Sequence, residues 1–185
     1  MILSLKHALL GFLNYQNMTG YQLKRYFDES VQHFWGASLS QIYPTLNQMR
    51  EEGLVNVEIV YQDNSPNAKL YHITEKGREE LIKWISGPID VQPLRSAFLV
   101  KLYFSSNVEK NIIIDQLKKQ LELSKQHMKI ADEGIEHIQD EHISTECMKK
   151  DAIYWSIAAD YCSKLEQFNM KWYEDTIKKL EDADL

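Results

Sequence analysis

The sequence predicts a mainly α-helical protein with one small β-hairpin, divided into a compact N-terminal domain and a C-terminal domain of long helices. Residues 38–78 show a helical pattern, two strand patterns joined by a polar turn, and the start of another helix. Residues 107–180 carry apolar side chains at steps of three and four along two long stretches. Residues 86–93 (SGPIDVQP) hold one Gly and two Pro, which interrupt helices. We therefore expect domains at residues 1–85 and 94–185, joined by a linker at 86–93.

Two helices are expected to open the N-terminal domain. Apolar residues recur at helical spacing along Ser4–Leu13, so one side of this segment can be buried. Thr19 is the expected N-cap of the second helix, because its hydroxyl can accept a backbone N–H of the first turn. Leu23, Tyr26 and Phe27 of that helix then face the same core.

A third helix, predicted at residues 40–52, has two contrasting sides. Ile42, Leu46 and Met49 form an apolar stripe at steps of three and four. The opposite side offers amide and hydroxyl groups without charge, from Gln41, Pro44, Thr45 and Gln48. A solvated helix surface normally carries Glu and Lys, whereas amides and hydroxyls in the first turns of a helix can read base edges in a DNA major groove. The pattern therefore indicates a recognition helix.

The ends of this helix are predicted from its serines, its proline and a glycine. Ser40 is the expected N-cap, because Pro44 limits how far upstream a regular helix starts. Ser38 is the alternative N-cap if the first turn is irregular. Gly53 supplies the left-handed residue that commonly follows a helix, so the helix should end there.

A β-hairpin is predicted directly after the recognition helix. Val55–Tyr61 alternates apolar and polar side chains, and Leu70–Ile73 gives a second strand. The polar segment Gln62–Ala68 between them has the composition of a turn. Thr74 then caps the next helix, and Lys69 is predicted to contact DNA phosphate or, alternatively, to be an ordinary solvated cation. A hairpin in this place is the wing of a winged helix-turn-helix domain.

Four segments resemble the PadR family of bacterial winged-helix transcriptional regulators. Two of them, FWGASLSQIYPTLNQMREEGLV (residues 34–55) and KLYHITEKGREEL (69–81), are similar to its recognition helix and wing. The first two helices of the family are matched by LLGFLNYQNMTGYQLKRYF (9–27). The segment PLRSAFLVKLYF (93–104) resembles the start of the long C-terminal helical domain in the larger subgroup, which includes phenolic-acid-responsive repressors. The wing departs from the family pattern, because many members carry several Arg and Lys there.

The resemblance implies a cytoplasmic, homodimeric repressor that binds a pseudo-palindromic operator in double-stranded DNA. It also implies release from DNA by a small aromatic or lipophilic effector. The residues predicted to contact DNA are Ser38, Ser40, Gln41, Tyr43, Pro44, Thr45, Gln48 and Lys69. The alternative function is a winged-helix module that binds another protein through the same polar helix face and does not bind DNA.

The charge of the chain keeps that alternative open. Residues 1–85 carry 8 basic and 9 acidic groups, a net charge of −1, and residues 86–185 carry 13 and 18, a net charge of −5, which gives the −6 of the whole chain. Neutralisation of phosphates dominates non-specific DNA affinity, so this chain should bind DNA weakly unless its cations share one surface. The cations expected there are Lys6, Lys24, Arg25, Arg50 and Lys69.

The C-terminal domain is predicted to form a homodimer through long helices. A short helix at Leu94–Phe104 precedes a long one capped by Asn107, and Thr145–Leu180 is a second long amphipathic helix. A heptad repeat along the first long helix predicts helix pairing, and two such helices from each chain can form a four-helix interface. The predicted dimer residues are Ile114, Leu117, Leu121, Met128, Ile135, Ile138, Trp155, Cys162, Leu165 and Trp172.

Aromatic residues suggest where an effector binds. The candidates are His33, Trp35, Tyr154, Trp155 and Tyr161. Their alternative role is packing, either in an aromatic-rich dimer core or, for His33 and Trp35, between the domains.

Other function classes are not expected. No apolar run is long enough to cross a membrane, and the start of the chain lacks the layout of a signal peptide. Cys147 and Cys162 are the only cysteines, which suits a reducing cytosol. No phosphate-binding glycine loop or nucleophile motif is present, so an enzyme is not predicted. His137, Glu141 and His142 have a spacing that can bind zinc, but such groups are common on solvated helix faces, so we predict no metal and no cofactor.

Overall fold

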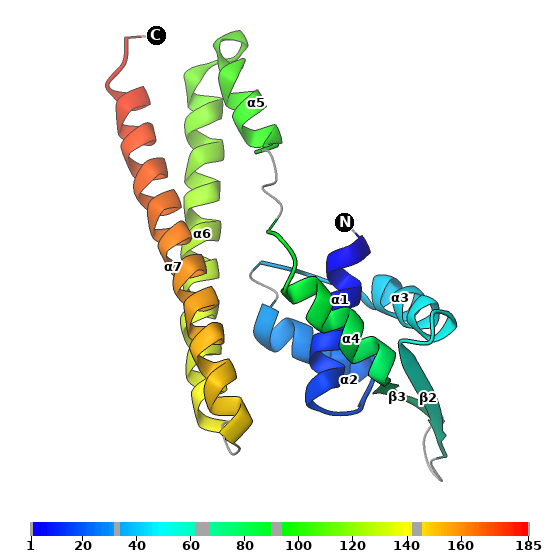
Figure 1. The fold of residues 1–185 in the computed structure, drawn as a ribbon. Coiled ribbons are helices and arrows are strands. Elements are labelled where there is room, and N and C mark those ends of the chain that lie inside the picture. The colour runs from blue at the N-terminus through cyan, green and yellow to red at the C-terminus, as the bar shows by residue number, and fades with distance from the viewer. Residues whose placement is uncertain (1, 32–33, 62–66, 90–93, 142–145, 185) are drawn as a thin grey trace. The chain divides into compact units, whose positions relative to one another are not determined.

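The computed structural model separates the chain into two compact units, Met1–Asp90 and Val91–Leu185 (Figure 1). The structure describes residues 2–31, 34–61, 67–89, 94–141 and 146–184, with side chains described outside 2–4 and 130–149. The predicted fold class, mainly helical with a small wing, is confirmed. None of the helices in the described residues combines the length and apolar character that crossing a membrane requires.

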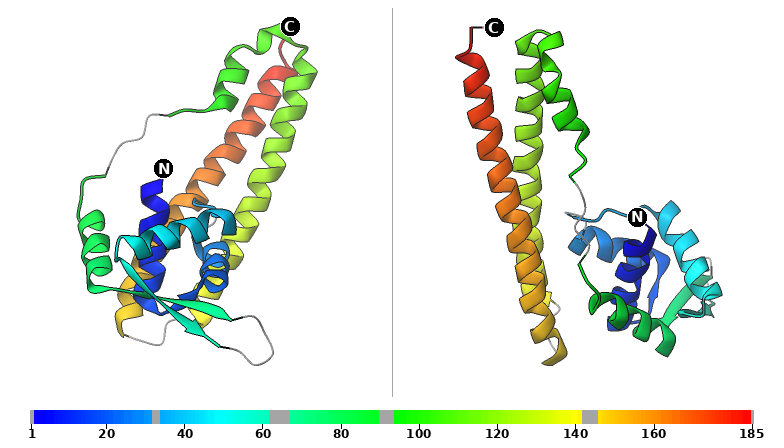
Figure 2. Two further views of the ribbon diagram at one scale, coloured as in Figure 1. Left: turned by 90° about the vertical axis from the view of Figure 1, so that its right-hand side faces the viewer. Right: turned by 45° about the horizontal axis from the view of Figure 1, so that its top comes forward.

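The first unit is a winged helix-turn-helix domain. Its elements are α1 (Ile2–Tyr15), β1 (Met18–Thr19), α2 (Gly20–Tyr26) with a π-helical continuation (Phe27–Val31), α3 (Leu39–Glu51), β2 (Val55–Val60), β3 (Ala68–Ile73) and α4 (Glu75–Ile85). The three strands are antiparallel in the order β1-β3-β2. Figure 1 shows the β2–β3 hairpin projecting away from the helices, and the left view of Figure 2 shows the same hairpin from another side.

The core of this unit is built from the apolar stripes of its helices. α3 contributes Ile42, Leu46 and Met49, each with no exposed surface. These side chains meet buried residues of α1, α2 and β3, among them Leu9, Leu10, Leu23, Phe27 and Tyr71. Because the predicted stripe of α3 is buried, its opposite side is fixed as the surface of the domain.

The hairpin leaves the core as it extends. In the register of β2 and β3, Val55 lies opposite Ile73 and Ile59 lies opposite Lys69. Val55 is buried, whereas Ile59 is 50% exposed, so the apolar side of β2 is covered only near α3. β1 was not predicted from the sequence, because a strand of two residues has no alternation to detect.

The helix ends partly agree with the predictions. Thr19 caps α2, since its Oγ1 accepts the Gln22 N–H at 3.3 Å. Gly53 has φ +69° after α3, as predicted. The prediction of Ser40 as the N-cap is wrong: Ser38 is the N-cap, with Ser40 already inside α3. The Ser38 N–H donates to Gln41 Oε1 at 3.0 Å, and this bond supports a start two residues farther from Pro44 than the proline led us to expect.

The second unit is a helical hairpin with a short leading helix. Its elements are α5 (Ala97–Tyr103), a 3₁₀ turn (Ser105–Asn107), α6 (Lys110–Glu141) and α7 (Glu146–Glu181). α6 and α7 lie side by side along their length in both Figure 1 and Figure 2. Ile114, Leu117 and Ile177 form the buried centre of their contact.

The predicted cap of the first long helix is wrong. Asn107 lies in the 3₁₀ turn, and its side-chain amide donates to the Phe104 carbonyl O at 2.9 Å. Val108 is extended, with φ −136° and ψ 161°, so α6 begins only at Lys110. The Asn107 amide therefore stabilises the turn that ends α5 and does not cap α6.

Candidate nucleic-acid interface

The surface side of α3 is polar and almost uncharged. Ser40, Gln41, Pro44 and Gln48 are exposed on this side, as predicted. Asn47 is exposed as well, although it was not among the predicted site residues. The spacing could have indicated this position: Pro44 lies four residues after Ser40, and Asn47 lies three residues after Pro44, so the three share one helix face.

Thr45 does not belong to this exposed side. It is only 8% exposed, and its Oγ1 donates to the Gln41 carbonyl O at 2.8 Å. Thr45 follows Ile42 by three positions and precedes Met49 by four, which places it beside the buried stripe. The prediction that Thr45 lies on the exposed polar side of the helix is therefore wrong, and Asn47 takes its place there.

Hydrogen bonds in the first turn of α3 restrict which groups remain available. Ser38 Oγ lies 2.8 Å from Ser40 Oγ and donates to Gln41 Oε1 at 3.0 Å. At the other end of the face, Gln48 Nε2 donates to Glu52 Oε1 at 2.7 Å. The groups left to recognise a ligand are the Gln41 amide N–H groups, the Gln48 amide oxygen and the whole amide of Asn47.

The edge of this face toward α2 carries two tyrosines. The rings of Tyr21 and Tyr43 meet edge to face, with centroids 6.4 Å apart. Tyr21 is 71% exposed and Tyr43 is partly buried. Burial, and then the neighbouring Tyr21, raise the pKa of Tyr43 above its usual value, so its hydroxyl keeps its proton. Tyr21 was not among the predicted site residues.

Most of the expected cations are already paired inside the unit. The Lys6 ammonium donates to Glu80 at 2.9 Å and lies 3.7 Å from Glu52, with only 15% of its side chain exposed. Lys24 pairs with Asp28. Arg25 similarly lies 3.6 Å from Glu29. Each of these three cations is therefore partly neutralised by a carboxylate of its own unit, and their gathering on one DNA-binding surface stays a prediction.

Two exposed cations remain near the recognition helix and wing. Arg50 lies in the last turn of α3, and Lys69 lies on β3 opposite Ile59. Neither forms an ion pair with another residue in the described part of the chain. Lys69 thus lies where it was predicted, on the wing and open to solvent.

The far end of α3 is fixed to α4 and α1 by polar contacts. Lys76 donates to the Glu52 carbonyl O at 2.7 Å, which pairs a cation with the C-terminal end of the α3 dipole. Hydrogen bonding from Lys6 is the largest influence that lowers the pKa of Glu80, and His7 adds to it from 3.3 Å. The exposed face of α3 is consequently held on a rigid scaffold.

Comparison with known proteins identifies the family. The model of the transcriptional regulator PadR-like family matches residues 9–83, and the model of the virulence activator alpha C-terminal region matches residues 94–181. The negative transcriptional regulator PadR of Bacillus subtilis is 34% identical over 132 residues, which span 69% of this chain and 70% of that protein. The chain belongs to the PadR-like family. Its relatives are transcriptional regulators and not enzymes.

Solved structures of PadR-like proteins share the whole fold. B. subtilis PadR in complex with operator DNA has a TM-score of 0.78 and 25% identity, covering 96% of this chain and 99% of that one. The virulence activator AphA of Vibrio cholerae has a TM-score of 0.75 and 25% identity, with 96% and 98% covered. B. subtilis PadR in complex with p-coumaric acid has a TM-score of 0.71 and 23% identity, with 98% of each chain covered.

The predicted dimer residues of α6 in this PadR-like chain pack within the chain. Ile114 and Leu117 are buried against α7, and Leu121 and Trp172 pack on the same cluster. Trp172 also meets Phe98 edge to face at 6.0 Å. The prediction that this seam faces a second chain is therefore wrong for Ile114 and Leu117, because the chain's own α7 covers them. For Leu121 and for Trp172, which lies on α7 itself, both half-buried, it stays a prediction. Met128 is half-buried, and the side chains of Ile135 and Ile138 lie outside the described residues.

A different apolar stripe lies on the outer side of α7. It consists of Ile153, Tyr154, Ile157, Tyr161, Leu165 and Phe168, which are 46–71% exposed. Leu165 is the one predicted dimer residue on this outer stripe. Trp155 and Cys162 are half-buried beside it. Exposed apolar strips of this length on a helix are typical of protein-interaction surfaces.

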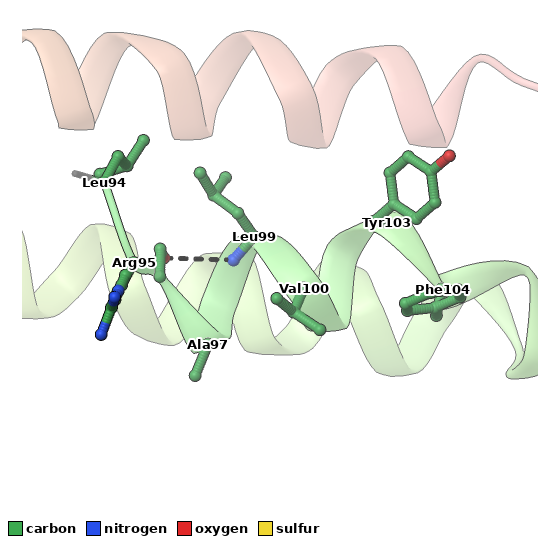
Figure 3. A pocket seen from close by; sticks show the side chains of 8 residues that line it. Leu94, Arg95, Ala97, Leu99, Val100, Tyr103 and Phe104 are labelled. Carbon is green, nitrogen blue, oxygen red and sulfur yellow. Dashed lines mark hydrogen bonds between the residues drawn. The ribbon is translucent and has the colours of Figure 1, made fainter.

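The predicted effector residues divide between the two units. Trp35 packs against the core of the first unit, while Tyr154 and Tyr161 are exposed on α7. His33 lies outside the described residues. A shallow groove along α5, which was not predicted from the sequence, has one cation and an otherwise mainly apolar lining (Figure 3). Its lining residues are Leu94, Arg95, Ser96, Ala97, Leu99, Val100, Tyr103 and Phe104.

Metal ligands do not gather in the described residues. No group of three or more His, Cys, Asp or Glu side chains there is placed to hold a metal ion. The side chains of His137, Glu141 and His142, weighed as zinc ligands, lie outside the described residues.

Proposed function

We propose that this chain is a cytoplasmic, homodimeric transcriptional repressor that binds a pseudo-palindromic operator in double-stranded DNA. The observation that carries the proposal is the exposed, uncharged side of α3 next to a projecting wing. B. subtilis PadR, which shares this fold and is named a negative regulator, has been solved with operator DNA. In this chain α3 enters the major groove, as recognition helices of this class do.

The groups of α3 divide into base-reading and backbone-contacting roles. Asn47 and Gln48 present amides, and a bidentate amide contact to adenine contributes about 1–3 kcal/mol of discrimination against other bases. Gln41 contributes its amide N–H donors, while Ser40 and Tyr43 contribute hydroxyls near the backbone. Further backbone contacts come from the Arg50 and Lys69 cations, because each neutralises phosphate charge.

The second copy binds through the outer stripe of α7. Ile153, Tyr154, Ile157, Tyr161, Leu165 and Phe168 would otherwise expose a continuous apolar surface to water. A dimer formed by two copies of α7 carries two copies of α3. Such a pair fits two half-sites about one turn of DNA apart.

A small aromatic or lipophilic compound releases the repressor. The proposal draws on B. subtilis PadR, which has been solved with p-coumaric acid, and on the half-buried aromatic residue Trp155 of α7. For release, the compound must bind the DNA-free form more tightly, by about 1.4 kcal/mol for each tenfold loss of DNA affinity.

Selection from genomic DNA tests the proposal against its alternative. The purified chain is mixed with genomic fragments at physiological salt, and the retained fragments are sequenced. The proposal predicts enrichment of one sequence with two related half-sites. The alternative is a module that binds a protein through α3; its support is the net charge of −1 over residues 1–85. Retention of no duplex by a folded dimer would favour that alternative.

A further inference from the structure

Two tyrosine hydroxyls lie at the junction of α2 and α3, on the edge of the recognition face. Tyr21 is 71% exposed, and its ring lies edge to face with that of Tyr43 at 6.4 Å. Within the described residues, neither hydroxyl has a hydrogen-bond partner. Both are therefore available to a ligand outside the domain.

Gly20 determines where the Tyr43 ring lies. A Cβ atom at Gly20 would come within 2.5 Å of Tyr43 Cε1 and 2.9 Å of the Tyr43 hydroxyl oxygen. Gly20 is the first residue of α2 and is buried. The hydroxyl end of the Tyr43 ring thus packs against the start of α2, in space that only glycine leaves open.

We infer that Tyr21 and Tyr43 together bind one phosphate of the DNA backbone beside the recognition helix, with Gly20 positioning Tyr43. The inference rests on the proposed function, since it requires that the chain binds duplex DNA. In helix-turn-helix proteins the helix before the recognition helix crosses the DNA backbone. Tyr21 lies on that helix, and tyrosine hydroxyls are among the groups that hydrogen-bond phosphate oxygens.

The paired contact also addresses the shortage of cations. Lys6 is half-buried in an ion-pair cluster with Glu80, and Lys24 is paired with Asp28. Two hydroxyls that donate to a phosphate anchor the backbone without adding positive charge. Burial and the neighbouring Tyr21 raise the pKa of Tyr43, so Tyr43 remains a donor at neutral pH. Hydrogen bonds to charged acceptors are stronger than those between neutral groups.

Tyrosine-to-phenylalanine substitutions test the pair, because they remove only the hydroxyl groups. The affinity of the full-length chain for its selected duplex is measured for Tyr21→Phe, Tyr43→Phe and the double variant. Each single change should weaken binding by about 10- to 150-fold per half-site, since a hydrogen bond to a charged group contributes about 1.5–3 kcal/mol. The slope of affinity against salt should stay as in the wild type, because no cation is lost. Tyr103→Phe, which removes an 83% exposed hydroxyl from α5, is the matched control and should bind as the wild type.

A duplex with single methylphosphonates locates the phosphate. Replacing one anionic phosphate oxygen by methyl removes its charge and one acceptor, one position at a time. The wild type should lose affinity at one position in each half-site where the double variant loses none. Such non-additivity shows that the hydroxyls and that phosphate interact directly. Equal losses in wild type and double variant at every position would overturn the inference.

Gly20→Ala tests the positioning role. The added methyl must displace the Tyr43 ring, so DNA affinity should fall in the wild-type background and fall no further in the double phenylalanine variant. Thermal unfolding identifies a loss that comes from misfolding, and in that case the phenylalanine variants decide. If the wild type binds DNA and the phenylalanine variants bind equally well, this inference fails and the proposed function stands. If the wild type binds no duplex, the proposed function itself fails.

Discussion

Replacing Asn47 with Ala tests whether the exposed side of α3 reads DNA bases. Asn47 is exposed, and Ala is the better helix former, by up to about 0.7 kcal/mol. The variant should therefore be as stable as the wild type or slightly more so. Loss of an amide–base contact should cost about 1–3 kcal/mol in each half-site, a fall of about 5- to 150-fold in affinity per half-site, and the factors of the two half-sites multiply.

Thr45→Ala is the matched control two positions away on the same helix. Thr45 is buried and bonded to the Gln41 carbonyl, so the change should lower the free energy of unfolding by about 1 kcal/mol. Its DNA affinity at temperatures far below unfolding should stay as in the wild type. The two substitutions should thus separate DNA reading from folding.

Fluorescence anisotropy with the selected duplex measures affinity, and urea titration measures stability. The Asn47 variant should also tolerate changes at one base pair of each half-site that the wild type rejects. The reasoning is refuted if Asn47→Ala binds the duplex as tightly as the wild type. It is equally refuted if both variants lose affinity in proportion to their loss of stability.

Three further outcomes follow from the structure. Lys69→Ala should weaken binding to all duplexes alike and lower the slope of log affinity against log salt concentration by about 1 per wing. Titration at several salt concentrations measures this slope. An altered sequence preference at an unchanged slope would argue against a phosphate contact. Ile157→Glu should give a monomer in sedimentation velocity, whereas the exposed control Gln167→Glu should stay dimeric. A dimeric Ile157 variant would show that the outer stripe of α7 is not the interface. Hydrogen bonding from Lys6 is the chief cause that lowers the pKa of Glu80 from its usual 4.5. The ionised Glu80 therefore stabilises the folded state above pH 4.5, and this contribution is lost as the pH falls through the lowered pKa. Glu80→Gln should therefore flatten the acid side of the thermal-stability profile, and an unchanged profile would contradict this.

Local chemistry made much of the first unit predictable. Thr19 caps the start of α2 and Gly53 follows the end of α3 as expected, because capping and a left-handed backbone depend on one residue and its nearest neighbours. The apolar stripe of α3 is buried as the spacing predicts. Thr45 was misplaced because a polar residue type was taken as a sign of exposure. Its hydroxyl is satisfied inside the helix by a backbone carbonyl, a bond that lets threonine be buried.

Long-range pairing was less predictable. The two residues of β1 join the sheet only because Met18 meets Tyr71 in space, and nothing local signals that pairing. The heptads at Ile114 and Leu117 correctly predict that α6 pairs with another helix. A repeat does not say whether the partner helix belongs to the same chain, and here α7 of the same chain covers the seam. Removing α7 would expose that seam, so point variants on the outer side of α7 test dimerisation more cleanly than truncation.

The account depends most on specific recognition of duplex DNA by the exposed side of α3. The direct measurement is the affinity of the wild-type dimer, at physiological salt, for the selected duplex and for a scrambled duplex of equal composition. The account predicts tighter binding to the selected duplex by about 10³-fold or more, as specific DNA-binding proteins show. Equal affinity for the two duplexes, or no binding by a folded dimer, would contradict it.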